Sequence, residues 1–265
     1  SVFSGASRSF VRVLAGQAAN AWVLDQRLAT PGAAAATDEI AIAPYLHVYG
    51  RNAFDPTDAA VIATWTQSQL FANLATAQTT EVDAWTADHV TLAATWGKSL
   101  VAYEGGQHLA GDQSNNALTA LFTGANRAAA MGTDYRTYLD HWRTATNGAL
   151  LMHFTDVGPY TKYGSWGALE TPEQTTSPKY AALGEYATGT TTTTSTSSTT
   201  TTTVAPTPSA LRFVAVDPGR VLDSRAPSTV GDFATPWAAG TVRDVQIAGR
   251  GGVPIGATAV SLNLT

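Results

Sequence analysis

Residues 99–108 read Ser-Leu-Val-Ala-Tyr-Glu-Gly-Gly-Gln-His. The first five form a short, mostly apolar run, which is typical of a strand buried on both faces of a sheet. A carboxylate, two glycines and an amide follow directly, so the strand should end in a tight polar turn. The stretch therefore predicts a buried strand whose carboxyl end carries Glu104.

Predicted helices separate this strand from three similar apolar runs. The other strands are expected at 10–15, 39–45 and 149–154. Apolar spacing predicts helices at 21–29, 58–77, 81–97, 115–130, 134–146 and 178–186. Strands that alternate with helices indicate an α/β fold with a parallel sheet.

Two architectures fit four strand–helix units. One is half of an eight-stranded (β/α)8 barrel, and the other is a small doubly wound sheet. Neither Gly-x-Gly-x-x-Gly nor Gly-x-x-x-x-Gly-Lys-Ser/Thr occurs in the sequence, which disfavours a nucleotide-binding doubly wound sheet. The half barrel is therefore the preferred interpretation.

Composition excludes several classes of function. The 265 residues include 15 basic and 20 acidic side chains, so the net charge is −5, and there is no cysteine. A mildly negative chain is poorly suited to nucleic acid or anionic membranes. Without cysteine the chain has no disulfides, zinc–thiolate sites, iron–sulfur clusters or thiol catalysis. No apolar run reaches the length of a membrane span.

A run of Thr and Ser divides the chain. Residues 188–203 are almost all Thr and Ser, and such a run has no apolar face to bury. We interpret 187–209 as an extended Thr/Ser/Pro-rich linker. The expected regions are a partial (β/α)8 domain at 1–186 and a partial β-rich accessory module at 210–265.

The ends of the sequence suggest a fragment. The chain opens on Ser-Val-Phe-Ser-Gly, and it closes on an apolar run that resembles the middle of a strand. We expect an extracellular, secreted protein whose signal peptide belongs to a missing N-terminal part.

Polar and aromatic residues follow each predicted strand. In a parallel barrel the active residues lie at the carboxyl ends of the strands. A mixture of amides, aromatic rings and a carboxylate suits a sugar, because rings stack on sugar faces and paired polar groups take hydroxyls. The candidates at these strand ends are Gln17, Asn20, Tyr45, His47, Tyr103, Glu104 and Trp166.

The motif Leu100-Val-Ala-Tyr-Glu-Gly-Gly106 resembles strand seven of the clan A glycoside hydrolases. These enzymes are (β/α)8 barrels whose nucleophile is a Glu at the end of that strand. The resemblance covers about residues 1–186 and implies the C-terminal half of a barrel, strands five to eight. It also implies that Glu104 is the nucleophile and that Trp166, in Gly164-Ser-Trp-Gly167, stacks under the sugar. Tyr45 and His47 would contact the sugar or the nucleophile.

A retaining glycosidase needs a second carboxyl group about 5–5.5 Å from the first. The family places this acid/base Glu at the end of strand four, normally after an Asn, and the sequence contains no Asn-Glu pair. We therefore expect the acid/base residue upstream of residue 1 and an inactive fragment. Asp156 follows the last strand, which is the wrong place for the acid.

Several candidates also have ordinary structural explanations. The amides Gln17 and Asn20 could simply bond to neighbouring loops. His108 and His153 are interpreted as structural. The histidines lack a ligand spacing such as His-Glu-x-x-His, so no metal site and no cofactor are expected.

The C-terminal region predicts short strands at 212–216, 220–225, 242–247 and 257–264, separated by Pro and Gly. Its Arg220-Val-Leu-Asp-Ser-Arg225 and Gly251-Gly-Val-Pro254 segments resemble a repeat of secreted bacterial proteins, and the resemblance implies attachment to a cell wall or polysaccharide. Asp223 between two arginines indicates a structural ion pair.

The sequence thus predicts a secreted retaining glycoside hydrolase that acts on a β-linked polysaccharide or oligosaccharide. Its partner would be carbohydrate, with no nucleic acid and no membrane span. The alternative is a non-catalytic carbohydrate-binding or cell-surface protein built on a degenerate barrel.

Overall fold

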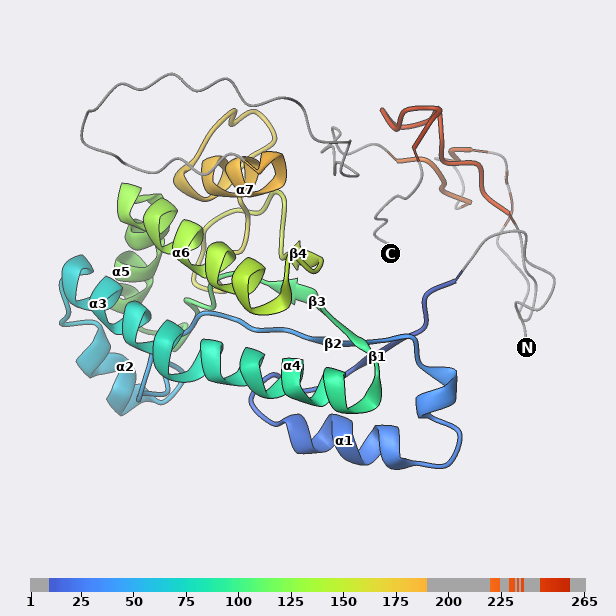
Figure 1. Ribbon diagram of the computed structural model, residues 1–265. Helices are drawn as coiled ribbons and strands as arrows, with labels where there is room; N and C mark the ends of the chain where they lie inside the picture. The colour runs from blue at the N-terminus through green and yellow to red at the C-terminus, as the bar shows by residue number, and fades with distance from the viewer. Residues whose placement is uncertain are drawn as a thin grey trace, which may run out of the picture. The chain divides into compact units, whose positions relative to one another are not determined.

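The computed structural model (Figure 1) describes residues 10–189, 220–224, 229–231, 233, 235 and 244–257. The chain divides into two compact units, Ser1–Thr199 and Thr200–Thr265. The first unit is a mixed α/β domain and contains every candidate site residue. The predicted linker at 187–209 spans the boundary between the units. Its first residues belong to a helix, and from 190 it lies outside the described residues.

The first unit is built on a four-stranded sheet in which all neighbouring strands are parallel. Its strands are β1 (Val13–Ala15), β2 (Glu39–Ile42), β3 (Ser99–Gly105) and β4 (Leu151–His153). They lie side by side in chain order, β1-β2-β3-β4. The predicted parallel α/β sheet is therefore confirmed, and β3 runs two residues further than expected.

Within the described residues, seven α-helices connect or follow the strands. They are α1 (Ala21–Ala29), α2 (Pro56–Ile62), α3 (Gln67–Ala77), α4 (Asp83–Trp96), α5 (Asn116–Arg127), α6 (Ala129–Thr146) and α7 (Pro178–Thr188). A short 3-10 helix (Ala34–Ala36) precedes β2, and a π-helical turn (Gln78–Val82) joins α3 to α4. The described part of the chain has no helix long and apolar enough to cross a bilayer.

The prediction of one helix over 58–77 is wrong, because the chain breaks between α2 and α3. Thr66 starts a new helix: its hydroxyl accepts from the Gln69 N–H at 3.2 Å, and the Gln69 side chain accepts from the Thr66 N–H at 2.8 Å. This reciprocal capping box satisfies two N–H groups that the start of a helix leaves unpaired. The Asp55 start signal is confirmed, since its carboxylate caps α2.

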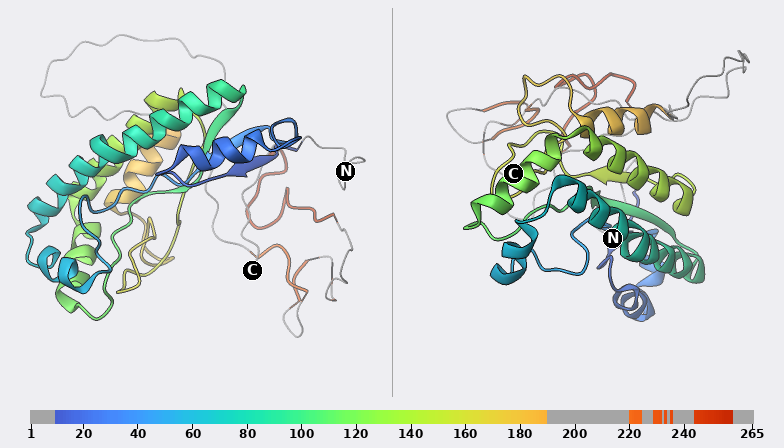
Figure 2. Two further views of the ribbon diagram at one scale, coloured as in Figure 1. Left: turned by 90° about the horizontal axis from the view of Figure 1, so that it is seen from below. Right: turned by 90° about the vertical axis from the view of Figure 1, so that its left-hand side faces the viewer.

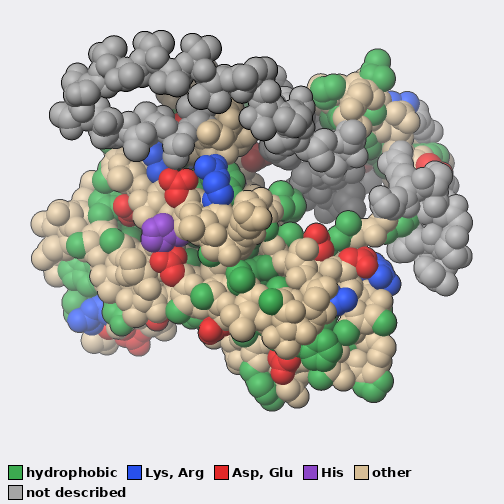
Figure 3. Space-filling view, viewed as in Figure 1, with side chains coloured by type: hydrophobic (Ala, Val, Ile, Leu, Met, Phe, Trp, Pro, Cys, Tyr) green, Lys and Arg blue, Asp and Glu red, His purple; other side chains and the backbone are tan. Residues whose placement is uncertain are grey.

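One face of the sheet packs against helices. Ile40, Ile42, Leu100 and Ala102 form a core with Leu24 and Leu28 of α1, Ala93 of α4 and Trp142 of α6. Helices α6, α4 and α1 follow one another in an arc along this face (Figure 2). Their outer surface carries scattered acidic and basic side chains of both signs (Figure 3).

The opposite face of the sheet is more open within the described structure. Ala41 and Val101 are buried at the centre of this face, but Val13, Tyr103 and Met152 on it are all exposed. Side chains alternate between the two faces of a strand, so these three residues mark the face away from the helices.

A second core fixes the loops that follow β2 and β3. Leu46, Val48 and Leu109 of these loops are buried with residues of α2, α3, α5 and α6. The loops are also paired: the Leu46 N–H donates to the Gly106 carbonyl at 2.9 Å, and the His108 N–H donates to the Leu46 carbonyl at 2.6 Å. The residues at the two strand ends are therefore held together by a rigid support.

The described residues of the second unit form little regular structure. Asp223 and Val230 make an isolated antiparallel bridge, and Arg220 pairs with Asp223, as the sequence indicated. Strands were expected at 212–216, 220–225, 242–247 and 257–264. Residues 244–247 are not in a strand, and 212–216 and 258–264 lie outside the described residues.

Candidate functional site

The candidate site lies where the strands of the parallel sheet end. Glu104 is the penultimate residue of β3, and Tyr45 follows β2. The pairing of β3 with β4 shifts register there: Ala102 pairs with Leu151 and Gly105 with His153. The extra residue in β3 breaks strict side-chain alternation at Glu104, as a β-bulge does.

Tyr45 and Glu104 face one another. The pKa of the Tyr45 phenol is raised by burial and by the Glu104 carboxylate, to which its hydroxyl turns. A neutral tyrosine can donate a hydrogen bond to a carboxylate. The two residues come from adjacent strand ends, and the bridge between Leu46 and Gln107 holds their loops in register.

An aromatic cluster adjoins this pair. The Trp166 ring lies 5.0 Å from His108, 6.0 Å from Tyr45 and 6.0 Å from Phe154, measured between ring centroids. All three ring pairs are T-shaped, with interplanar angles of 65–70°. The indole N–H donates to the Tyr163 carbonyl at 3.2 Å and thereby fixes the ring in its loop. We refer to Tyr45, Glu104, His108, Phe154 and Trp166 as the Glu104 cluster.

His108 belongs to this cluster, although the sequence analysis interprets it as a structural residue. Its ring lies 5.7 Å from Tyr45 as well as 5.0 Å from Trp166. Burial lowers the pKa of its imidazole, so the ring is neutral at pH 7. The available signal was its position two residues after the Gly105-Gly106 turn, but the direction of a side chain after such a turn does not follow from spacing.

A pocket of about 320 Å³ opens beside the cluster. Tyr45 and His108 belong to both, and Phe54, with its ring 6.1 Å from His108, lies on the opposite wall. The pocket is lined by Ala43, Tyr45, His47, Val48, Arg51, Asn52, Ala53, Phe54, Trp85, His108 and Ala110. Aromatic walls with a few polar groups are typical of small-molecule sites.

His47 lines this pocket but turns towards the helices. Its ring stacks on Trp85 at 5.4 Å with an interplanar angle of 6°. Its Nε2 lies 3.0 Å from a carboxylate oxygen of Glu81. The structure therefore places His47 at the pocket wall and provides it with partners other than Glu104.

The remaining candidates, Tyr103, Gln17 and Asn20, lie at or near the carboxyl ends of their strands. Tyr103 is 43% exposed on the open face of the sheet and is close enough to influence the Tyr45 pKa. Gln17 and Asn20 are exposed at the end of β1. Among the described residues, neither amide side chain forms a hydrogen bond with the Glu104 cluster. The structure thus brings Tyr45, Tyr103 and Trp166 to Glu104, but gives Gln17 and Asn20 no such contact.

The backbone after Glu104 is held by two buried tyrosines of α6. The Gly106 N–H donates to the Tyr138 hydroxyl at 3.2 Å, and the Gln107 N–H donates to the Tyr135 hydroxyl at 3.1 Å. A Cβ on Gly105 would collide with the Tyr138 hydroxyl. Close packing therefore requires glycine at position 105, and these contacts hold the backbone next to Glu104 in a fixed position.

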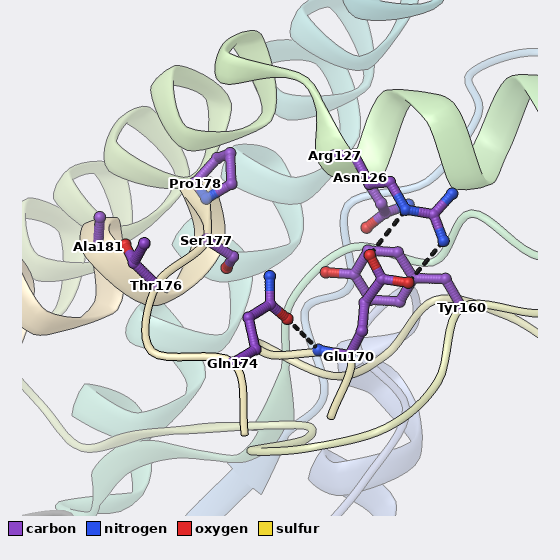
Figure 4. A pocket seen from close by; sticks show the side chains of 9 residues that line it. All are labelled: Asn126, Arg127, Tyr160, Glu170, Gln174, Thr176, Ser177, Pro178 and Ala181. Carbon is purple, nitrogen blue, oxygen red and sulfur yellow. Dashed lines mark hydrogen bonds and ion pairs between the residues drawn. The ribbon is translucent and has the colours of Figure 1, made fainter. Parts of the chain in front are cut away.

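A second pocket, of about 520 Å³, lies between α5 and the start of α7 (Figure 4). Its charged groups satisfy one another: Arg127 forms two hydrogen bonds with Glu170, at 2.7 and 2.5 Å. The Gln174 side chain accepts from the Glu170 N–H at 2.6 Å. This pocket offers a ligand few free polar groups.

Within the described residues, no group of three or more His, Asp or Glu side chains is arranged to hold a metal ion. The fold and site define an α/β protein with a carboxylate and aromatic cluster at the carboxyl edge of a parallel sheet. Searches against protein-family models, curated proteins and solved structures found no significant match.

Proposed function

We propose that the chain is the nucleophile-bearing part of a retaining glycoside hydrolase that acts on a β-linked polysaccharide or oligosaccharide. The observation that carries this proposal is the position of the Glu104 carboxylate, which faces the Tyr45 hydroxyl beside the Trp166 ring. A carboxylate can serve as the nucleophile of a retaining glycosidase, a neighbouring phenol can orient it, and an aromatic ring can pack against a sugar.

The topology supports a half barrel over a doubly wound sheet. Parallel crossovers are almost always right-handed, so strands added in chain order place their helices on the same face. The observed order β1-β2-β3-β4 has no reversal, whereas a doubly wound sheet reverses direction at its switch point. In the proposed barrel the open face of the sheet is the interior.

The chemistry follows from the positions of the side chains. A Glu104 oxygen attacks the anomeric carbon while the bond from that carbon to the leaving oxygen breaks. A second carboxyl group protonates that oxygen and later activates water, which releases the sugar from Glu104. Tyr45 orients the Glu104 carboxylate, and Trp166 supports the sugar ring.

The proposal keeps what the resemblance implies about the second carboxyl group, namely that it comes from sequence outside these 265 residues. No cofactor takes part in this reaction. The Thr-rich segment and the β-rich module expected from the sequence suit a secreted enzyme that attaches to a cell wall or polysaccharide through residues 210–265.

Rescue of a nucleophile variant by azide tests the role of Glu104. The full-length natural protein that contains this chain is assayed with aryl β-glycosides. Its Glu104→Ala variant should lose nearly all turnover. Added azide should restore it and yield the α-glycosyl azide, because azide replaces the missing nucleophile. Glu173→Ala, at an exposed position in the loop before α7, is the matched control and should stay active.

An unaltered rate in Glu104→Ala would refute the proposal. Sugar binding without any turnover by the natural protein would instead support the alternative, a non-catalytic carbohydrate-binding protein.

A further inference from the structure

Lys179, in the first turn of α7, has a completely buried side chain. Its ammonium donates to the Ser165 carbonyl at 2.6 Å and to the Asn126 side-chain oxygen at 2.9 Å. It also lies 4.4 Å from the centroid of the Tyr160 ring. A buried lysine is costly unless its charge is matched by such partners, so this side chain is held in one position.

The Ser165 carbonyl receives a second donor. The side-chain Nε2 of Gln107 donates to the same oxygen at 2.8 Å. The side-chain Oε1 of Gln107 accepts from the Leu109 N–H at 2.7 Å. Gln107 lies three residues after Glu104, and Ser165 immediately precedes Trp166. One carbonyl thus connects the Glu104 loop, α7 and the Trp166 loop.

Several charged and titratable groups surround Lys179. Glu170 attracts its charge, Arg127 of α5 pairs with Glu170, and His153 of β4 is influenced by the ammonium. Burial lowers the pKa of Lys179 to about 7, while Glu170 opposes that shift. Asn126 and Tyr160, which hold the ammonium, also line the pocket of Figure 4.

We propose that Lys179 is a positioning residue for the sugar platform: through the Ser165 carbonyl it fixes the Trp166 ring relative to Glu104. The role in sugar binding rests on the proposed function, whereas the control of the Trp166 ring does not. Lys179 is too deeply buried to touch a substrate itself, so its effect must pass through Trp166.

Lys98 provides a matched comparison. Its ammonium also donates to two backbone carbonyls, those of Ala34 and Thr37, both at 2.7 Å. It lies just before β3, at the end of the sheet opposite Glu104. Lys98→Met therefore removes the same kind of anchor without touching the Trp166 loop.

The first test measures the emission of Trp166 in the whole chain. Its contribution is isolated by subtracting the spectrum of Trp166→Phe in each background. Lys179→Met should shift this difference emission to the red and make it easier to quench with acrylamide, and Lys98→Met should leave it unchanged. An unchanged Trp166 emission in folded Lys179→Met would overturn the proposal.

Should Lys179→Met fail to fold, Lys179→Gln takes its place. Glutamine keeps an N–H donor but is one atom shorter and uncharged, so a smaller red shift is expected. The absence of any shift in this variant would count against the proposal in the same way.

The second test measures affinity for β-linked gluco-, manno- and xylo-oligosaccharides in a double-mutant cycle. Lys179→Met should weaken binding about 5-fold or more in the presence of Trp166, and hardly at all in Trp166→Ala, because the two changes act through one platform. Additive effects would exclude action through Trp166. If the unaltered chain binds none of these sugars, the proposed function is in doubt, and the emission test still decides whether Lys179 positions Trp166.

Discussion

The Tyr45 hydroxyl, at the end of β2, faces the Glu104 carboxylate, at the end of β3. Burial and the neighbouring carboxylate both raise the Tyr45 pKa, so the phenol keeps its proton across the neutral range. The bulge in β3 and the paired loops hold this geometry in the absence of substrate. A nucleophile oriented in advance reduces the reorganisation needed in the transition state.

In the proposed mechanism Tyr45 orients Glu104, so Tyr45→Phe should lower kcat/KM of the full-length protein without unfolding it. A hydrogen bond to a charged group contributes about 1.5–3 kcal/mol, which corresponds to roughly a 10- to 150-fold loss. Steady-state kinetics with an aryl β-glycoside measure the effect. Tyr180→Phe, at an exposed position on α7, is the control and should retain full activity. Equal kinetics for both variants would show that Tyr45 does not assist Glu104.

Trp166→Ala should abolish most sugar binding by the 265-residue chain. Its ring is the centre of the aromatic cluster, and large aromatic contacts dominate the energetics of such sites. Calorimetric titration with β-linked oligosaccharides measures the affinity. Trp22→Ala, which removes an exposed tryptophan of α1, should leave the affinity unchanged. Equal losses in the two variants would contradict a specific platform.

Gly167→Ala should destabilise the Trp166 loop. A Cβ at this position would overlap the Leu169 carbonyl oxygen and the Gly158 backbone, neither of which can move as a flexible side chain can. Overpacking of this kind costs about 1–3 kcal/mol or more. Urea unfolding of the chain measures the change.

Gly184→Ala is the control for Gly167→Ala, and the opposite effect on stability is expected. It lies inside α7 with no atom near the added methyl group, so it should stabilise the chain by about 0.5–1 kcal/mol. If Gly167→Ala were as stable as the unaltered chain, the tight packing assigned to this loop would be incorrect.

Asp134→Asn should stabilise the chain at pH 7 and have little effect at pH 4. Burial raises the pKa of Asp134 to about 6, above the value of about 3.9 expected in the unfolded chain. Between these values the folded chain binds more protons, so the free energy of unfolding falls as the pH rises from about 4 to 6. Asparagine removes this penalty, with a gain of about 1–2 kcal/mol at pH 7.

Urea unfolding at both pH values measures the effect of Asp134→Asn. Asp88→Asn, at an exposed position on α4, serves as the control. An identical gain at pH 4 and pH 7 would mean that ionisation of Asp134 does not oppose folding.

The sequence predicted the fold well where the local pattern agreed with the tertiary packing. The bounds expected for α1, 21–29, are those observed, because its two buried leucines mark a regular apolar stripe. The break before α3 was missed, although Thr66 and Gln69 have the spacing of a capping box. Apolar periodicity alone does not reveal the break, because α2 and α3 both bury apolar residues in the same core.

The candidate site was predicted in part. Glu104 lies at the end of β3, Tyr45 and Trp166 come after β2 and β4, and parallel strands bring their carboxyl ends to one edge. His108 and Lys179 were not identified, because their roles depend on side-chain direction and burial. A lysine in the exposed-looking segment Pro178-Lys-Tyr180 gives no sign that α5 and the Trp166 loop enclose it.

The most direct test of the account is to trap the glycosyl-enzyme. The full-length natural protein that contains this chain is incubated with 2-deoxy-2-fluoro β-glycosides, and labelled peptides are mapped by mass spectrometry. The account predicts a label on Glu104, absent from Glu104→Gln and retained in Glu170→Gln. A label on another carboxylate, or no label on a protein that still hydrolyses or binds these sugars, would contradict Glu104 as the nucleophile.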